Sequence, residues 1–495
     1  MRLLRGVGVA FAVSVAGLIA LDLIKQPARP DYRPVVRATA LSSRPSPALD
    51  APPCSGSARR WLVVGWDGAG WDQLLPLLDA GRLPRLAGLL ERGSHGNMLG
   101  FKPSLSPALW TTIATGRSPE DHGITGFDRR RHRLLRRWDR VASLGKRKRR
   151  LLTNAERRVR ALWNLLDEAG RESLIVGYHN TFPAERLRGA MVSNWLVQTH
   201  MADGMRAEMA PPDFEGGLAY PRELRRELLE LERRVSDSWE REILEFVDFE
   251  PNGEKEFRRW VDDSATLGER EGRWPYFTRR AWTFDAFHAE AALLLMPRIN
   301  ADLTMVHFQS ADWALHQFLF FHQPELFATA GSDWDEATRE RLEIARPRYD
   351  GTVTRFFEFL DNQLGRLIDA AGPETSVLVL SDHGFDPHRD PWSSGYHDEA
   401  PPGFWVAAGP GVRSRVRSEH ATIYDIAPTL LASLGHELSL TLDGVVLSDV
   451  LCEPAEPVAT IDDYESGPRF LPPIAVPEEL TNELERQLRS LGYVQ

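Results

Sequence analysis

Short apolar runs alternate with helical patterns along most of this chain, and this alternation restricts the fold more than any other feature. The runs are WLVVGW (61–66), SLIVGY (173–178), LTMVHFQ (303–309), SVLVLS (376–381) and FWVAAG (404–409). Residues 355–372 and 422–435 instead repeat apolar residues at helical spacing. Continuous apolar strands separated by helices are typical of a parallel sheet with helices on both faces. We therefore expect an α/β fold, a three-layer α/β/α sandwich with a mainly parallel central sheet and helical insertions.

The N-terminal segment differs from the rest of the chain. Arg2 and Arg5 precede an uncharged apolar run from Gly6 to Leu21, which is shorter than the ~20 residues of a spanning helix. Residues 1–25 fit a signal peptide or a short signal anchor, and we expect an anchor that stays on the chain. The arginines of this segment would remain in the cytoplasm, so the rest of the chain would be exported to the periplasmic or extracellular face.

The remaining residues divide into a spacer and one large domain. Residues 26–58 are rich in Pro and Ala and are expected to form a disordered linker. Residues 59–495 would form the catalytic domain, with insertions near 129–160 and 204–300. The first insertion is dense in Lys and Arg, and the second is charged and helical in pattern. Both are expected to lie over the top of the sheet.

Charge and cysteine content exclude several classes of protein. The formal net charge of -10 argues against a nucleic-acid-binding protein. Two cysteines are too few for a disulfide scaffold, a Cys-rich zinc module or an iron–sulfur site. The basic stretch at 129–150 is read first as a solvated face and second as a cradle for an anionic or lipid substrate near the membrane.

Acidic and imidazole side chains stand where the predicted strands end. Because ligands bind outside the carboxyl ends of the strands in an open parallel sheet, such residues are candidate ligands. They are Asp67, Asp312 with His316 four residues later, Asp382 with His383, and His397 in the loop before 404–409. Each feature alone is ordinary, since an Asp after a strand commonly caps the next helix. Together they offer carboxylate and imidazole ligands that suit Zn²⁺ or Mn²⁺, in a number that suits two cations.

Ser106 is the candidate nucleophile. It is followed by Pro107 and an apolar helical run that ends at Gly116. Ser at the N-cap with Pro at the first helical position is a favourable helix start, and the free N–H groups there would suit a phosphate. A serine hydroxyl is a weak nucleophile until a base or a cation activates it. His122 is interpreted as a structural residue before Gly123, and His179, after 173–178, as a candidate substrate contact.

Several segments resemble the alkaline phosphatase superfamily, most closely its type I phosphodiesterase and nucleotide pyrophosphatase branch. The similar blocks are VVGWDGAGWD, PSLSPALWTTIATGRSPEDHGI, HNTFPAERLRGAMVS, SDHGFDPH, GYHDEAPPGFWVAAGPGV, YDIAPTLLASLG and LRSLGYV. The resemblance implies one metal site at Asp67, Ser106, Asp382 and His383, and a second at Asp312, His316 and His397. Nucleotide-hydrolysing relatives carry an Asn three residues after the nucleophile to help hold phosphate, and Leu109 occupies that substrate-binding position here. The sulfatase pattern Cys-x-Pro-x-Arg is absent.

These features predict a metal-dependent phosphodiesterase or phosphatase that acts through a phosphoseryl intermediate. Its cofactors would be two divalent cations, Zn²⁺ or Mn²⁺, and its substrate a phosphate ester of a small molecule, lipid or glycan. Two alternatives remain: a membrane-anchored transferase that moves a phospho-head group at the same site, and a non-catalytic surface binding protein. The membrane would be contacted through the N-terminal anchor, and no nucleic acid is expected as a partner.

Overall fold

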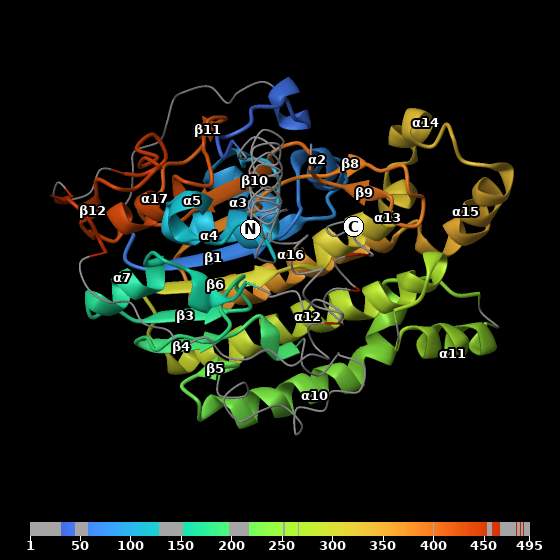
Figure 1. The fold of residues 1–495 in the computed structure, drawn as a ribbon, viewed down its shortest axis with the longest axis horizontal. Coiled ribbons are helices and arrows are strands. Elements are labelled where there is room, and N and C mark those ends of the chain that lie inside the picture. Colours follow the sequence, from blue (N-terminus) through green and yellow to red (C-terminus); the bar gives the residue numbers. More distant parts are fainter. Residues whose placement is uncertain are drawn as a thin grey trace, which may run out of the picture.

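The computed structural model contains a nine-stranded central sheet between two layers of helices (Figure 1). It describes residues 31–44, 58–127, 152–197, 217–250, 253–265, 267–398, 400–452 and 458–465, with residues 482, 486 and 489. The strand order is β11-β2-β10-β7-β1-β6-β3-β4-β5. The bounds are β1 Trp61–Trp66, β2 Ser94–Met98, β3 Ser173–Val176, β4 Gly189–Val192, β5 Ala219–Tyr220, β6 Leu303–Phe308, β7 Ser376–Leu380, β10 Gly403–Ala408 and β11 Arg417–Ser418.

The centre of the sheet is parallel, as predicted. Strand β1 pairs in parallel with β6 and β7, and β3 pairs in parallel with β4 and β6. Antiparallel pairs occur toward the edges, where β10 pairs with β2 and β7, and β4 pairs with β5. Two small ribbons complete the strands, β8 (Asp386–Pro387) with β9 (Gly395–Tyr396), and β12 (Leu438–Ser439) with β13 (Thr460–Ile461).

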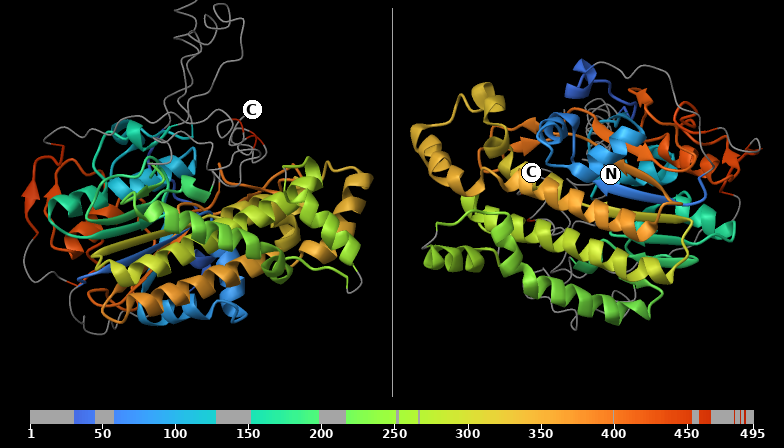
Figure 2. Two further views of the ribbon diagram at one scale, coloured as in Figure 1. Left: turned by 90° about the horizontal axis from the view of Figure 1, so that it is seen from below. Right: turned by 180° about the vertical axis from the view of Figure 1, so that it is seen from behind.

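Helices cover both faces of the sheet (Figure 2). Successive strand residues alternate between two apolar cores. In β1, Leu62 and Val64 face the core that contains α12, whereas Trp61 and Val63 face the core that contains α4. The α12 side holds α2 Trp71–Asp79, α3 Pro84–Arg92, α10 Leu224–Glu242, α12 Arg273–Leu295, α13 Ser310–His322 and α16 Thr352–Ala371. The α4 side holds α4 Ser106–Thr115, α7 Leu162–Glu168 and α17 Ile426–Ser433. This arrangement is the predicted three-layer sandwich.

Shorter elements connect these layers. The remaining helices are α5 Pro119–His122, α11 Glu254–Asp263, α14 Phe327–Ala330 and α15 Glu336–Tyr349, and the 3₁₀ helices are Ala40–Ser43, Asn154–Glu156, Ile243–Glu245, Arg270–Gly272, Met296–Arg298 and Pro324–Leu326. Helices α11, α14 and α15 lie at one end of the molecule, beyond the strands (Figure 1). In the part of the chain that the structure describes, no helix combines the length and apolar character needed to cross a membrane.

The segment predicted as a charged insertion over the sheet contains a helix of the sandwich itself. Helix α12 packs against β6, β3, α13 and α16, and most of its side chains are buried. Helices α10 and α11 carry most of the charge, with apolar residues such as Leu228 and Trp260 turned inward. The average composition of residues 204–300 concealed α12, because two amphipathic helices precede it. The basic stretch at 129–150 lies outside the described residues.

Residues 31–44, which fall within the predicted linker, pack against the domain. The Thr39 hydroxyl donates to Asn97 Oδ1 across 2.8 Å, and the Ala40 N–H donates to Asp72 Oδ1 across 2.6 Å. The Arg37 guanidinium forms an ion pair with Asp386. This part of the segment is therefore held by specific polar contacts, whereas the predicted anchor at 1–25 lies outside the described residues.

Candidate active site

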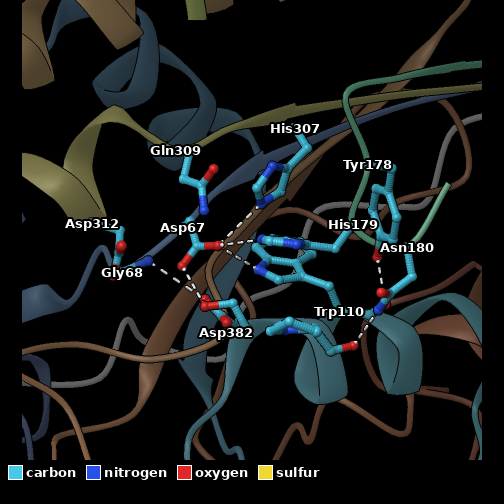
Figure 3. Close-up of polar contacts among 12 residues, drawn as sticks. Asp67, Gly68, Trp110, Tyr178, His179, Asn180, His307, Gln309, Asp312 and Asp382 are labelled. Carbon is cyan, nitrogen blue, oxygen red and sulfur yellow. Dashed lines mark hydrogen bonds and ion pairs between the residues drawn. The ribbon is translucent and has the colours of Figure 1, made fainter. Parts of the chain in front are cut away.

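Asp67 lies at the centre of the polar cluster. It directly follows β1, where its N–H donates to the carbonyl of Phe308 across 2.9 Å, and its side chain is fully buried. The Ser106 hydroxyl donates to Oδ1 across 3.3 Å, and the Trp110 indole N–H donates to Oδ2 across 2.9 Å. Burial alone would raise the pKa of Asp67, but contacts with His179, His307 and His383 outweigh it and hold that pKa well below its usual value. Asp67 is therefore an anion that several N–H and O–H groups surround (Figure 3).

Ser106 is the first residue of α4, and this differs from the predicted cap by one position. The N-cap is Leu105, whose carbonyl accepts from the N–H groups of Ala108 and Leu109. The Ser106 hydroxyl therefore does not cap the helix and is directed to Asp67 instead. The sequence analysis expected free N–H groups at this helix start to suit a phosphate, but those of Ala108 and Leu109 are already used within the helix.

Asp312, His316 and His397, the set that the resemblance implied as a second metal site, lie close together and form a second cluster. His316 Nε2 lies 3.5 Å and His397 Nε2 lies 3.8 Å from Asp312 Oδ1. The Nδ1 of His316 donates to the carbonyl of Gly395 across 2.9 Å, which directs Nε2 toward Asp312. Burial raises the pKa of Asp312 well above its usual value and lowers the pKa of His316 to about 3. Neutral imidazoles beside a carboxyl group form a set of potential metal ligands.

Asp382 and His383 follow β7 and join the two clusters. His383 Nε2 lies 3.5 Å from Asp67 Oδ1 and 3.6 Å from Asp382 Oδ2, and its ring stacks on His397 with centroids 4.0 Å apart. Burial raises the pKa of Asp382 to about 8; burial opposes the charge on His383, but the carboxylates around it raise its pKa to about 10. The structure thus brings all the predicted metal ligands into one buried region.

Gly68 permits the close approach of the two clusters. It has a left-handed φ of 76°, and a Cβ at this position would lie 2.9 Å from the Cα of Asp312. Its N–H lies 3.4 Å from Asp382 Oδ1, to which it donates. The Asp-Gly sequence after β1 therefore allows helix α13 to place Asp312 beside Asp67.

His307 is a site residue that the sequence analysis missed. It is the fifth residue of β6, and its Nε2 lies 3.2 Å from Asp67 Oδ2. His179, predicted as a substrate contact, lies beside it with Nε2 3.3 Å from the same oxygen. Leu303 and Met305 share the α4 side of the sheet with His307, so a lone imidazole on an apolar strand face was the available signal.

Two buried residues of α12 hold the segment between β6 and α13. The carboxylate of Asp285 accepts from the N–H groups of Gln309 and Ser310, each across 2.8 Å. His288 Nδ1 donates to the carbonyl of His307 across 3.1 Å. Burial raises the pKa of Asp285 to about 7 and lowers the pKa of His288 to about 3. Both residues contact the backbone that carries candidate ligands.

Leu109 and His122, the two other positions that the sequence analysis singled out, make no hydrogen bond to the carboxylates of the cluster. Leu109 is fully buried in the core on the α4 side, where its side chain offers no hydrogen bond. His122 hydrogen-bonds through Nε2 with Thr112 Oγ1 across 3.0 Å and accepts at Nδ1 from the N–H of Ile124.

Asn180 donates to the carbonyl of Pro107 and to Thr111 Oγ1, each across 2.9 Å, and so ties the end of β3 to α4.

The donor set fits divalent cations. In each of three groups of residues, the ligand atoms lie close enough together to hold a metal ion. The groups are Asp67, His179 and His307; Asp312, His383 and His397; and Asp67, Asp382 and His383. Asp312 Oδ1, Asp382 Oδ2 and His383 Nε2 are buried and make no hydrogen bond within the described residues. Such atoms are costly to bury, and a cation would satisfy them.

Comparisons with known proteins agree with the chemistry of the site. A family model described as type I phosphodiesterase / nucleotide pyrophosphatase matches residues 61–427. No curated protein sequence matches the chain.

Solved structures that resemble the chain do so at low identity. A mutant of the alkaline phosphatase PafA matches with 10% identity, a TM-score of 0.48 and coverage of 81% of this chain and 100% of that one. Murine ectonucleotide pyrophosphatase / phosphodiesterase 5 in complex with AMP has 13% identity, a TM-score of 0.39 and coverage of 80% and 100%. BT1596, a 2-O GAG sulfatase, has 14% identity, a TM-score of 0.43 and coverage of 79% and 73%. The assignment of this chain to a family therefore rests on the match to the family model and not on these structures.

Proposed function

The chain belongs to the type I phosphodiesterase / nucleotide pyrophosphatase family, and from this we propose that it is a metal-dependent hydrolase of phosphate esters with Ser106 as its nucleophile. One observation carries the proposal. The Ser106 hydroxyl points at Asp67 within a buried cluster of carboxylates and imidazoles. Ser106 does not cap helix α4, so helix capping does not account for the direction of its hydroxyl.

The residues fall into two proposed cation sites. Asp67, Ser106, Asp382 and His383 would hold one cation, and Asp312, His316 and His397 would hold the other. The mixture of carboxylate and imidazole ligands favours Zn²⁺, with Mn²⁺ as the second choice. When bound, such cations lower the pKa of a coordinated hydroxyl group and offset negative charge on phosphoryl oxygens.

The chain's own residues would orient and accept the phosphoryl group. Ser106 Oγ would form a bond to phosphorus as the ester oxygen departs and takes up a proton, leaving phosphoserine. A water molecule would then attack phosphorus, release phosphate or a phosphomonoester, and return the Ser106 hydroxyl. Asp67 fixes the direction of Oγ, and helix α4 is itself fixed because Tyr178 Oη donates to the carbonyl of Trp110 across 3.0 Å.

Leu109 limits the choice of substrate. Because its side chain is apolar and buried in the core, it cannot supply the amide contact of the nucleotide-hydrolysing relatives. We therefore place the substrate among phosphate esters in general, of a small molecule, lipid or glycan, and not specifically among nucleotides. The cellular location is proposed from the sequence alone: residues 1–25 would anchor the chain at the periplasmic or extracellular face.

The proposal is tested with p-nitrophenyl phosphate and bis(p-nitrophenyl) phosphate, with and without a chelator. We expect turnover that a chelator abolishes and Zn²⁺ restores, and loss of about 10³-fold or more in Ser106→Ala. Acid quenching followed by peptide mass spectrometry should locate a phosphoryl group on Ser106. Wild-type turnover in Ser106→Ala would overturn the assignment. Product analysis with an added glycan acceptor separates a hydrolase, which yields free phosphate, from a transferase, which yields a new ester.

A further inference from the structure

We propose that the buried guanidinium of Arg280 marks a binding site for a small inorganic monoanion, such as chloride, at the interface of α12 and α13. This anion site is distinct from the proposed cation sites and goes beyond the proposed function. It would be built by Arg280 and Thr283 of α12 and by Trp313 and Gln317 of α13.

Arg280 is a buried cation that forms no ion pair. The residue is 1% exposed. Its Nε and Nη1 are shielded from solvent and make no hydrogen bond, and no carboxylate of the described residues forms an ion pair with it. An isolated charge is costly to bury, and an arginine side chain does not avoid this cost by losing its proton. An anion bound at the guanidinium would remove the cost.

The guanidinium lies against aromatic rings. Arg280 Cζ lies over the ring of Trp313, 5.1 Å from the ring centroid. Phe277 and Phe284 of α12 also pack against Trp313, with centroids 6.4 Å and 5.4 Å away. The face of an indole ring attracts a cation, but it offsets only part of the cost of taking that cation out of water. The contact with Trp313 therefore does not replace a counter-ion.

The neighbouring Arg279 makes the same kind of contact at a partly exposed position. Its Cζ lies over the ring of Trp239, 4.6 Å from the centroid. The carboxylates of Glu240 and Glu232 favour its charged form, and its side chain is only partly shielded from water. Arg280 has the aromatic contact without the access to water. We therefore expect an anion at Arg280 and not at Arg279.

Two further buried groups at this helix interface lack hydrogen bonds. Thr283 lies one turn after Arg280 on α12, and Gln317 lies one turn after Trp313 on α13. The two helices pack against each other (Figure 1). Thr283 Oγ1 and both amide atoms of Gln317 are buried and make no hydrogen bond within the described residues. A hydroxyl O–H and an amide N–H can both donate to an anion.

A monoanion of atomic size fits these residues best. One negative charge balances the single charge of Arg280, whereas a phosphate dianion would leave a net charge in the interior. Arg280, Thr283 and Gln317 are each at most 1% exposed. A bulky anion could not reach them without separating α12 from α13.

The anion would stabilise the packing of α12 on the first turns of α13. Trp313 directly follows Asp312, which belongs to a proposed cation site. Neutralising Arg280 would favour the contact between its guanidinium and the ring of Trp313 in the interior. The anion should therefore stabilise the folded protein.

The test uses the full-length protein in buffers in which sodium chloride replaces sodium gluconate at constant ionic strength. We expect the Tm of wild type to rise by about 2 °C once chloride is tenfold above its Kd. Arg280→Met keeps a long apolar side chain and removes the charge, so its Tm should not depend on chloride. Arg279→Met is the matched control and should keep the chloride-dependent rise.

A second measurement locates the anion directly. Crystals of wild type soaked in sodium bromide should show an anomalous peak in contact with the Arg280 guanidinium. Absence of that peak would overturn the anion site, and so would an equal chloride-dependent rise in wild type and Arg280→Met. If Arg280→Met fails to fold, the bromide peak in wild type decides.

Discussion

Trp110 donates its indole N–H to Oδ2 of Asp67 across 2.9 Å, one helical turn after Ser106 donates to the other oxygen of the same carboxylate. Positions four residues apart lie on one face of a helix, so α4 donates two side-chain hydrogen bonds to Asp67 from the same face. The spacing of Ser106 and Trp110 thus couples the position of the nucleophile to the end of β1.

Replacing Trp110 with Phe should weaken this coupling while keeping an aromatic ring in place. A hydrogen bond to a buried charge contributes about 1.5–3 kcal/mol, so the free energy of unfolding should fall by about that amount. Phosphate ester turnover should also fall, because Ser106 loses its fixed direction. Trp163→Phe is the matched control, since Trp163 donates to buried Glu185 across 2.9 Å away from the cluster. Equal losses of turnover in both variants would contradict a specific role for Trp110.

Cation binding should release protons. Asp382, with a pKa raised to about 8 by burial, and His383, with a pKa raised to about 10 by the surrounding carboxylates against the effect of burial, are both largely protonated at pH 7 without a cation. A ligating carboxylate and imidazole must lose any proton that they carry, so protons are released at this site and affinity rises with pH. Calorimetric Zn²⁺ titrations in two buffers with different protonation enthalpies measure the number. Identical heats in both buffers would contradict the prediction.

The candidate ligands that sequence reasoning found are those whose positions follow from local rules. Asp67 directly follows β1 and Asp382 follows β7 after Ser381, and parallel strands of one sheet end at the same edge. Asp312 and His316 stand one helical turn apart, so their convergence on one face was expected. The three-layer fold followed from the same alternation of strands and helices.

The residues that sequence reasoning missed depend on contacts between distant elements. His307 stands inside β6, where a histidine is ordinarily a core residue, and its role appears only once α4 and β3 bring Trp110 and His179 beside it. Asp285 and His288 lie on α12, which the charged composition of its neighbours concealed. The exact start of α4 also needed coordinates, since Ser106 differs from the expected cap by a single position.

Asp285→Asn tests whether α12 positions the second cluster. The amide keeps the volume of the side chain but replaces one acceptor oxygen with NH₂, so one of the N–H groups of Gln309 and Ser310 loses its partner. We expect about 10–100-fold weaker Zn²⁺ binding at Asp312, with the fold retained. Asp361→Asn is the matched control, because Asp361 accepts from the N–H groups of Arg85 and Leu86 at the start of α3.

Zinc affinities of the two variants, measured by competition with a chromogenic chelator, decide between a local and a general effect. A loss in Asp285→Asn alone supports positioning of α13. Equal losses in Asp285→Asn and Asp361→Asn would show that the change acts through overall stability, and unchanged affinity in both would remove Asp285 from the site.

His122 should contribute to acid unfolding. Burial, with help from nearby Arg157, lowers its pKa to about 3, whereas the unfolded chain has a value near 6.5. Between these values the unfolded state binds a proton that the folded state does not, so stability rises with pH by about 1.4 kcal/mol per unit across the window. The hydrogen bonds agree with a neutral ring, since Nδ1 accepts from the N–H of Ile124 and cannot also carry a proton.

The free energy of unfolding in urea is measured for wild type and His122→Gln between pH 7 and about pH 4, after a chelator has removed bound metal. The difference between the two proteins isolates the contribution of His122. The variant should be less stable at pH 7, because glutamine fills the buried site less well. That difference should shrink as the pH falls, since only wild type must keep a proton off position 122 in order to stay folded. The other buried histidines, such as His316, titrate in both proteins and cancel in the comparison. A gap that stays constant from neutral to acid pH would show that His122 does not resist protonation.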